Sequence, residues 1–214
     1  IYERRRITEL ALRYAVKENL VGFVLGGLLV GSIVLVFMIT GSISFTILNP
    51  FNVIFKPLIL LILFALMEEI IFRAIIYRIT EQSLGTWLAI IISALLFGLG
   101  HIMNSHVNFL SILSVALAGV FLGALYTIRS RLWLPLAVHV GWNFFQYFFG
   151  LPISGNDDFK YFLEASREGP EWFVGGGFGI ENSVLAIVLI LAVSIYLLYR
   201  ARMQGRIVIP YWNR

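Results

Sequence analysis

Several long apolar segments, each of roughly 20 residues, dominate this 214-residue chain. An α-helix needs about 20 mostly apolar residues to cross the hydrocarbon core of a bilayer. The candidate spans are residues 20–40, 57–77, 86–103, 108–127, 132–149 and 182–199. Lipid cannot satisfy an open strand edge, and these segments lack the alternation typical of a membrane β-barrel. The sequence therefore predicts an all-α, polytopic membrane helix bundle with about six transmembrane helices.

The composition excludes an ordinary soluble domain. Hydrophobic residues make up 59% of the chain, charged residues only 13%, and the mean hydropathy is +0.89, whereas soluble domains have about 45–50% apolar and about 25% charged residues. The absence of cysteine excludes disulfides and thiolate metal sites. The net charge of +4 does not indicate a nucleic-acid partner, because the cations lie in short loops between apolar segments; the bilayer is the expected partner.

The segments around the predicted spans differ in character. Residues 1–19 carry apolar positions on one helical face among several arginines, which fits either an interfacial helix or a cytoplasmic tail. Residues 20–199 form the predicted membrane domain, with a cytoplasmic tail at 200–214. The connection 150–181 is rich in Gly and acidic residues, and its aromatic residues favour an ordered cap. Because the sequence begins with Ile1 instead of Met, we expect that preceding residues were removed.

The distribution of Lys and Arg predicts the orientation. If the N-terminus is cytoplasmic and the spans are even in number, only Lys56, Lys160 and Arg167 lie outside. Positive charge accumulates in cytoplasmic loops. We therefore expect a multi-pass protein of the cell membrane with both termini in the cytoplasm and the connection 150–181 outside.

Two pairs of glycines have the four-residue spacing that lets membrane helices approach closely. They are Gly27 with Gly31, and Gly119 with Gly123. We expect both pairs to serve packing and not chemistry.

Ionisable residues inside a span are informative, because each costs about 2.5–3.5 kcal/mol near the bilayer centre. Span 57–77 contains Glu68, Glu69 and Arg73. Glu69 and Arg73 are four residues apart and share a helical face, so they are expected to pair. Glu68 points about 100° away, which favours a free base. Taken alone, the three residues are also consistent with pinning neighbouring helices.

Two later spans each carry a histidine. Phe97 and His101 share one face of span 86–103, and His139 and Asn143 share one face of span 132–149. Two hydrogen-bond donors on one face suit an oxyanion hole, although His and Asn also bond across membrane helices for structural reasons. The third histidine, His106, is interpreted as a loop residue.

Taken in order, the motifs Glu68-Glu69-x-x-x-Arg73, Phe97-x-x-x-His101 and His139-x-x-x-Asn143 resemble the CPBP (ABI) family. This family comprises CAAX proteases and bacteriocin-processing enzymes, including the type II CAAX prenyl endopeptidases. The resemblance covers about residues 57–149, and the Gly-rich stretch 172–179 resembles a loop of bacterial members. It implies an all-helical intramembrane endopeptidase acting on a membrane-associated or prenylated peptide.

The resemblance also implies roles for the motif residues. Glu68 and His101 would activate water, while His139 and Asn143 would stabilise the oxyanion. Glu69, Arg73 and Phe97 would support them. Members of the family have been described as metalloproteases, and a glutamate with two histidines can ligate zinc. The spacing is not the His-Glu-x-x-His of zincins, so we expect a glutamic-type mechanism without a cofactor, with zinc as the alternative.

Two other functions remain open at this point. The first is a CPBP-type immunity or scaffold protein that does not require proteolysis; substitution of Glu68 separates it from an enzyme. The second is a transporter that relays protons through intramembrane acids. Transporters commonly contain inverted repeats and interrupted helices, and the sequence shows neither.

Overall fold

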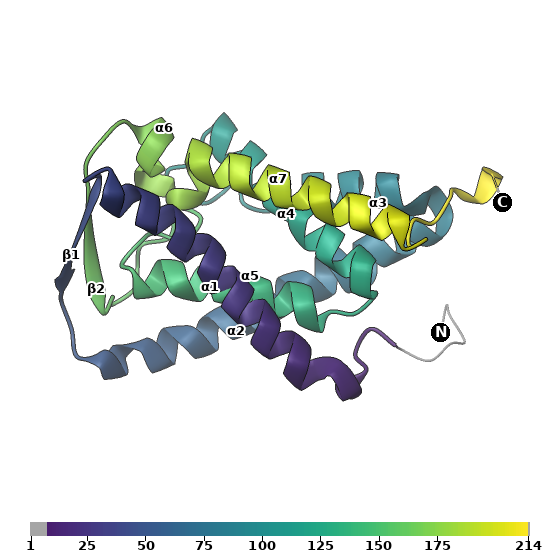
Figure 1. Cartoon of the computed structure of the whole chain (residues 1–214), viewed down its shortest axis with the longest axis horizontal. Coiled ribbons are helices and arrows are strands. Elements are labelled where there is room, and N and C mark those ends of the chain that lie inside the picture. The colour runs from purple at the N-terminus through teal and green to yellow at the C-terminus, as the bar shows by residue number, and fades with distance from the viewer. Residues whose placement is uncertain (1–7, 214) are drawn as a thin grey trace.

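The computed structural model describes residues 8–213, and within them six long helices form a bundle (Figure 1). The helices are α1 (Ala15–Ile39), α2 (Phe55–Glu69), α3 (Arg78–Leu99), α4 (Phe109–Arg129), α5 (Trp133–Phe148), the single turn α6 (Glu171–Val174) and α7 (Val184–Met203). The two strands β1 (Ile43–Ile47) and β2 (Leu163–Arg167) pair antiparallel, with Ile43 opposite Arg167. The predicted all-α class is confirmed.

Three helices of the described chain are long and apolar enough to cross a membrane. They are the helical stretch Leu12–Ile39, which contains α1, and the helices α4 and α7. Helices α2 and α5 have 15 and 16 residues, and α3 is broken at Gly85, where φ is +79°. For these three segments the predicted membrane crossing stays a prediction.

Helices α1 and α5 cross at very short range because both carry glycine at the contact. A Cβ atom on Gly26 would lie 2.4 Å from the carbonyl oxygen of Val138, and one on Gly141 would lie 2.4 Å from that of Phe23. The predicted packing role is confirmed for Gly27, which faces the Phe145 ring, but is wrong for Gly31, whose Cβ would have no neighbour within 4 Å.

The other predicted glycine pair lies on α4. A Cβ atom on Gly119 would lie 2.9 Å from the Cα of Ala94 on α3, so this glycine permits close helix contact. A Cβ on Gly123 would meet the Tyr77 ring at an ordinary 3.7 Å. Of this pair, only Gly119 lies so close to a neighbouring helix that a Cβ atom would clash.

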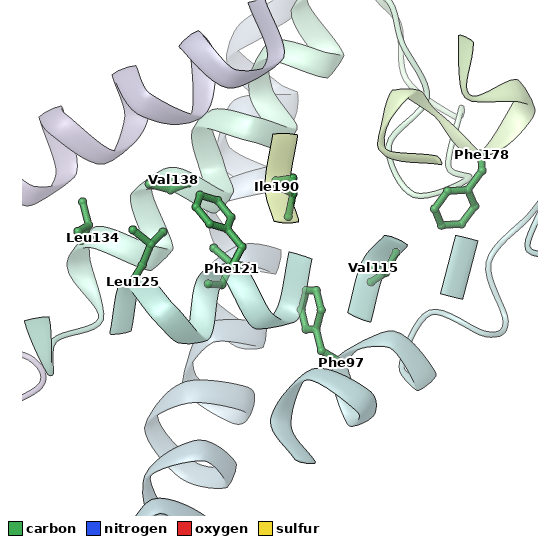
Figure 2. Close-up of a cluster of buried hydrophobic side chains, with 9 residues drawn as sticks. Phe97, Val115, Phe121, Leu125, Leu134, Val138, Phe178 and Ile190 are labelled. Atoms are coloured by element: carbon green, nitrogen blue, oxygen red, sulfur yellow. The ribbon is translucent and has the colours of Figure 1, made fainter. Parts of the chain in front are cut away.

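The core lies where α3, α4, α5 and α7 meet. Figure 2 shows Phe97, Phe121, Val138 and Ile190 converging from these four helices, and each is at most 5% exposed. In lipid, such contacts stabilise the bundle through close packing and not through the hydrophobic effect. Phe97 connects this core to the polar site described below.

The two termini of the described chain lie at the same end of the bundle, and the β1–β2 ribbon lies at the opposite end (Figure 1). At the terminal end, Leu132 donates to the carbonyl oxygen of Glu9, and Thr86 donates to that of Val208. Residues 1–7 lie outside the described residues. Residues 8–14 of the predicted interfacial segment form a turn and then a 3-10 turn, Leu12–Tyr14, which leads directly into α1. These residues form no separate interfacial helix.

The connection 150–181 is ordered, as its aromatic residues predicted. It contains β2, α6 and two short 3-10 turns. Phe178 is buried, and Phe173 packs on the Phe37 ring of α1 at a centroid distance of 5.2 Å. Trp172 is exposed, so it contributes less to this cap.

Candidate active site

The end of α2 carries a buried ion pair. After Glu69 the helix widens into a π-helical segment, Ile70–Tyr77, a rare geometry that is frequent at functional sites. Arg73 Nη1 donates to Glu69 Oε1 at 2.9 Å, and both side chains are fully buried. Arg73 Nη2 also donates to the Gly119 carbonyl oxygen at 3.2 Å, which ties the pair to α4. The predicted pairing is confirmed.

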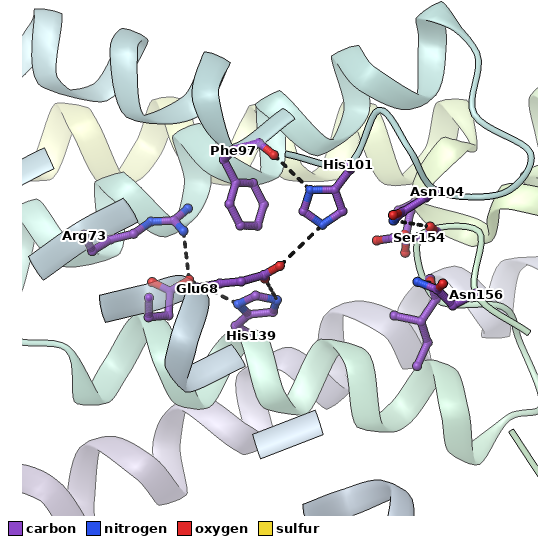
Figure 3. A network of polar contacts seen from close by, with 11 residues as sticks. Glu68, Arg73, Phe97, His101, Asn104, His139, Ser154 and Asn156 are labelled. Atoms are coloured by element: carbon purple, nitrogen blue, oxygen red, sulfur yellow. Dashed lines mark hydrogen bonds and ion pairs between the residues drawn. The ribbon is translucent and has the colours of Figure 1, made fainter. Parts of the chain in front are cut away.

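Glu68 faces a different environment from Glu69. Its side chain is 23% exposed and lies between two histidines (Figure 3). Glu68 Oε1 is 3.8 Å from His101 Nε2, and Glu68 Oε2 is 3.5 Å from His139 Nε2. Glu68 therefore has no cationic partner in its own helical turn, as predicted, but it has two ring partners from other elements.

The outer hydrogen bonds of both histidines orient their rings. His101 Nδ1 is 2.9 Å from the Phe97 carbonyl oxygen, which can only accept, so Nδ1 carries the hydrogen. His139 Nδ1 is 3.1 Å from Glu69 Oε1. The same oxygen accepts the hydrogen bond from Arg73 Nη1. Both Nε2 atoms therefore face Glu68, at separations that are too long for a direct hydrogen bond and that a single water could bridge.

Helix α3 ends at Leu99, so His101 lies in the turn beyond it and not inside a helix that runs to residue 103. Gly100, a poor helix former, stands at the junction. Beyond the end of the helix, the His101 ring lies beside Glu68.

Phe97 holds the site together from the apolar side. It is 3% exposed, and its ring lies 4.6 Å below the Arg73 guanidinium carbon. The same ring lies 5.0 Å from the His101 ring and 6.0 Å from the His139 ring, between centroids. Phe97 thus contacts Arg73 and both imidazoles, and its supporting role stays a prediction.

A cavity of about 410 Å³ opens beside these residues. Glu68, His101, His139 and Asn143 all line it. Asn143 follows His139 by one turn of α5, so the predicted shared face is confirmed. His139 lines the cavity and also contacts the carboxylates of Glu68 and Glu69.

His106 lies in the loop between α3 and α4, as predicted. It is exposed, has a φ of +57° and is not among the residues lining the cavity.

Sequence reasoning missed the polar residues at the other end of the cavity. Glu181, Ser154 and Asn104 line it, and two of them come from the long connection. Ser154 donates to Glu181 Oε1 at 2.6 Å, and Asn104 donates to the Ser154 carbonyl oxygen at 2.8 Å. The one sequence signal that could have identified Glu181 is its position as an acidic residue directly before the apolar segment that forms α7.

Glu68, His101 and His139 are residue types that can bind zinc. Among residues 8–213, no three His, Cys, Asp or Glu side chains converge as a metal-ligand group. The separations of 3.8 and 3.5 Å from Glu68 to His101 and His139 suit a bridging water, but they are also close to the spacing of about 3.3 Å between two ligands of a tetrahedral zinc ion. The expectation of a metal-free site therefore stays a prediction.

A family model described as Rce1-like, type II CAAX prenyl endopeptidase, matches residues 50–145. No curated protein and no solved structure matches the chain. The matched range contains all three motifs, and it confirms the family resemblance that those motifs carry.

Proposed function

Since the family model described as Rce1-like, type II CAAX prenyl endopeptidase, matches residues 50–145, we propose that this protein hydrolyses a peptide bond with a water activated by Glu68. The family consists of membrane proteases, and this protein has the apolar helices of a membrane protein. The observation that supports the proposal most is the position of Glu68. Its two oxygens face two imidazole Nε2 atoms at the wall of a cavity.

In the proposed reaction, a water molecule lies between Glu68 and His101. Glu68 accepts a proton as the water oxygen attacks the carbonyl carbon, giving a tetrahedral intermediate. The carbon–nitrogen bond then breaks, and Glu68 returns the proton to the leaving amine. The tautomer fixed by the Phe97 carbonyl leaves His101 Nε2 free to accept a hydrogen bond from the water.

His139 and Asn143 are proposed to donate to the carbonyl oxygen as negative charge develops there. Because His139 Nδ1–H already points at Glu69, this role requires the doubly protonated ring, whose Nε2–H is the second donor. Arg73 prevents Glu69 from being an uncompensated buried charge.

The proposal also includes the orientation of the bundle in the membrane. The cation-rich end that holds both termini is assigned to the cytoplasm, so the cavity end built by the connection 150–181 faces outside. The substrate is a membrane-associated peptide, prenylated or not, that reaches the cavity from that end.

The enzymatic function is tested in cells by comparative proteomics of a Glu68→Gln strain. Uncut membrane peptides should accumulate in this strain, and their termini identify the substrate. A strain that keeps both the wild-type peptide pattern and the biological effect of the protein contradicts proteolysis and supports the immunity or scaffold function.

The proposal that no metal takes part has its own test. Purified protein should contain no stoichiometric zinc, and chelators should leave cleavage intact. One zinc per chain, lost together with activity on chelation and restored with it, reverses the proposal.

A further inference from the structure

The turn that carries His101 is not held by the side chains next to it. Beyond the end of α3 the backbone continues as single turns, in which Asn104 N donates to the His101 carbonyl oxygen at 3.1 Å. Turns of this i-to-i+3 type have poorer hydrogen-bond geometry than an α-helix. The two side chains that follow His101 are Ile102 and Met103, which are 52% and 90% exposed. The position of His101 therefore depends on contacts made by the rest of the loop.

The long connection supplies one such contact through Asn104. Asn104 Nδ2 donates to the Ser154 carbonyl oxygen at 2.8 Å, and Figure 3 shows this contact on the His101 side of the site. Ser154 and Gly155 form a tight turn with φ values of +48° and +82°. A Cβ atom on Gly155 would clash with the Ser105 carbonyl oxygen, so the two backbones touch directly. Both loop residues, 104 and 105, are thus seated on the connection.

His106 is seated on the same connection. A Cβ atom on Gly177 would lie 2.7 Å from His106 Cγ, so any side chain at position 177 would displace the ring. His106 has a φ of +57°, a left-handed conformation that costs free energy and persists where the surrounding structure over-determines it. Phe178, the next residue, is 1% exposed and accepts from Gly155 N at 2.7 Å. The Gly-rich stretch therefore contacts both the loop and the turn on which the loop rests.

Building on the proposed role of His101 beside the attacking water, we infer that Asn104 and Gly177 are positioning residues for His101. They hold the loop 104–106 on the connection, and the loop fixes where the His101 ring lies relative to Glu68. The connection thereby acts on the site through His101, although it is distant in sequence from the three motifs.

The loop is required because the hydrogen bond of the His101 ring itself is local. His101 Nδ1 is 2.9 Å from the carbonyl oxygen of Phe97, four residues earlier, so this bond orients the ring on the end of α3. His101 Nε2 and Glu68 Oε1 lie 3.8 Å apart on different elements, a separation that a single water can bridge. A displacement of about 1 Å at a reacting group can lower a rate about 10²-fold. A small movement of the loop is thus enough to disable the pair.

The test is nitrogen NMR of the histidine rings in purified full-length protein. The chain contains three histidines, so isotope labelling of histidine gives three sets of ring signals, and His101→Gln identifies the set of His101. The spectra are recorded at about pH 8.5, well above the ordinary imidazole pKa of about 6.5. Wild-type His101 should show the Nδ1–H tautomer alone, because the Phe97 carbonyl oxygen accepts that hydrogen.

Two variants release the loop. Asn104→Ala removes the bond to the connection, and Gly177→Ala places a methyl group against the His106 ring. In each variant the His101 signals should shift toward an average of both tautomers, because the ring is no longer held in one orientation. The His139 signals should stay at their wild-type positions, since that ring is held by Glu69.

Asn49→Ala is the matched control. Asn49 Nδ2 also donates to a carbonyl oxygen of the connection, that of Tyr161, at 2.8 Å, but Asn49 does not line the cavity. This variant should leave the His101 signals unchanged. If Asn104→Ala does not fold, Asn104→Asp takes its place, because it keeps the size of the side chain and loses the N–H donor.

Turnover of a membrane peptide gives a second readout. Asn104→Ala should lower kcat by about 10–10²-fold and leave KM near the wild-type value, because its effect passes through His101. Asn104 also lines the cavity. A raised KM together with unchanged His101 signals would make Asn104 a substrate-binding residue and overturn the inference.

The spectra overturn the inference in three further cases. These are a wild-type His101 without the Nδ1–H tautomer, unchanged His101 signals in the folded loop variants, and an equal change in Asn49→Ala. The spectra need no substrate. If they change as expected while the wild type cleaves no peptide, the proposed function fails and the positioning of His101 stands.

Discussion

Glu68 and Glu69 are neighbours in the chain, but their surroundings give them different chemistry. Glu69 is fully buried and bound to Arg73, while Glu68 is partly exposed at a cavity between two imidazoles. The 100° offset between successive helical residues was sufficient to predict this division from the sequence. It was not sufficient to predict that His139 contacts both carboxylates, because that contact depends on how α5 packs against α2.

Arg73→Ala should reduce the folded yield and the thermal stability in detergent. The substitution leaves Glu69 buried without its cation, and breaking such a pair typically costs about 3–5 kcal/mol. Thermal unfolding of purified protein measures the effect, with Arg129→Ala, at an exposed position on α4, as the matched control. Equal stability of Arg73→Ala and wild type would refute the structural role of the pair.

Asn143→Ala should lower kcat by about 10²–10³-fold, the usual effect of losing one oxyanion donor. KM should stay near the wild-type value, since the interaction strengthens only in the transition state. Steady-state kinetics on a membrane peptide measure both constants. If KM rises while kcat is unchanged, Asn143 binds substrate and the oxyanion assignment is wrong.

At the scale of the elements, irregular helix geometry builds the site. The π-helical segment follows Glu69, α3 ends two residues before His101, and Gly85 breaks the start of α3. The apolar runs predicted where the helices lie to within a few residues. They could not predict the π-helix or the helix end at Leu99, because these depend on tertiary contacts such as the bond between Ser93 and the Phe72 carbonyl oxygen.

The α1–α5 crossing gives a prediction with an internal control. Gly26→Ala should destabilise the bundle by about 1–3 kcal/mol, the typical cost of overpacking. The reason is that the added Cβ would lie 2.6 Å from the backbone nitrogen of Trp142. Gly31→Ala, on the same helix, meets no neighbour and should be neutral or stabilising by up to about 1 kcal/mol. Thermal unfolding of the two variants compares them directly, and equal losses would contradict the crossing.

At the scale of the whole molecule, both termini of the described chain lie at one end of the bundle and the β1–β2 ribbon lies at the opposite end (Figure 1). The distribution of Lys and Arg predicts that the end with both termini faces the cytoplasm, and this orientation stays a prediction. The sequence did not predict that the connection 150–181 folds back to bury Glu181 in the cavity wall. Periodicity carries no information on where a long irregular segment packs, so this half of the cavity was missed.

The proposed orientation is testable with single cysteines, because the chain contains none. Lys160→Cys should react with a membrane-impermeant thiol reagent added to intact cells. Arg129→Cys, exposed at the opposite end, should react only after the cells are opened. Labelling of residue 160 only from inside would reverse the assignment.

The central claim is that Glu68 is the base of a peptidase, and its most direct test is the turnover of purified Glu68→Gln protein. The substrate is a membrane peptide identified by the proteomic comparison, with Glu164→Gln as the control for loss of one acid. The amide cannot accept the proton of the attacking water, so kcat should fall by at least about 10²–10⁴-fold, while Glu164→Gln retains wild-type activity. Cleavage by Glu68→Gln at the wild-type rate would contradict the account.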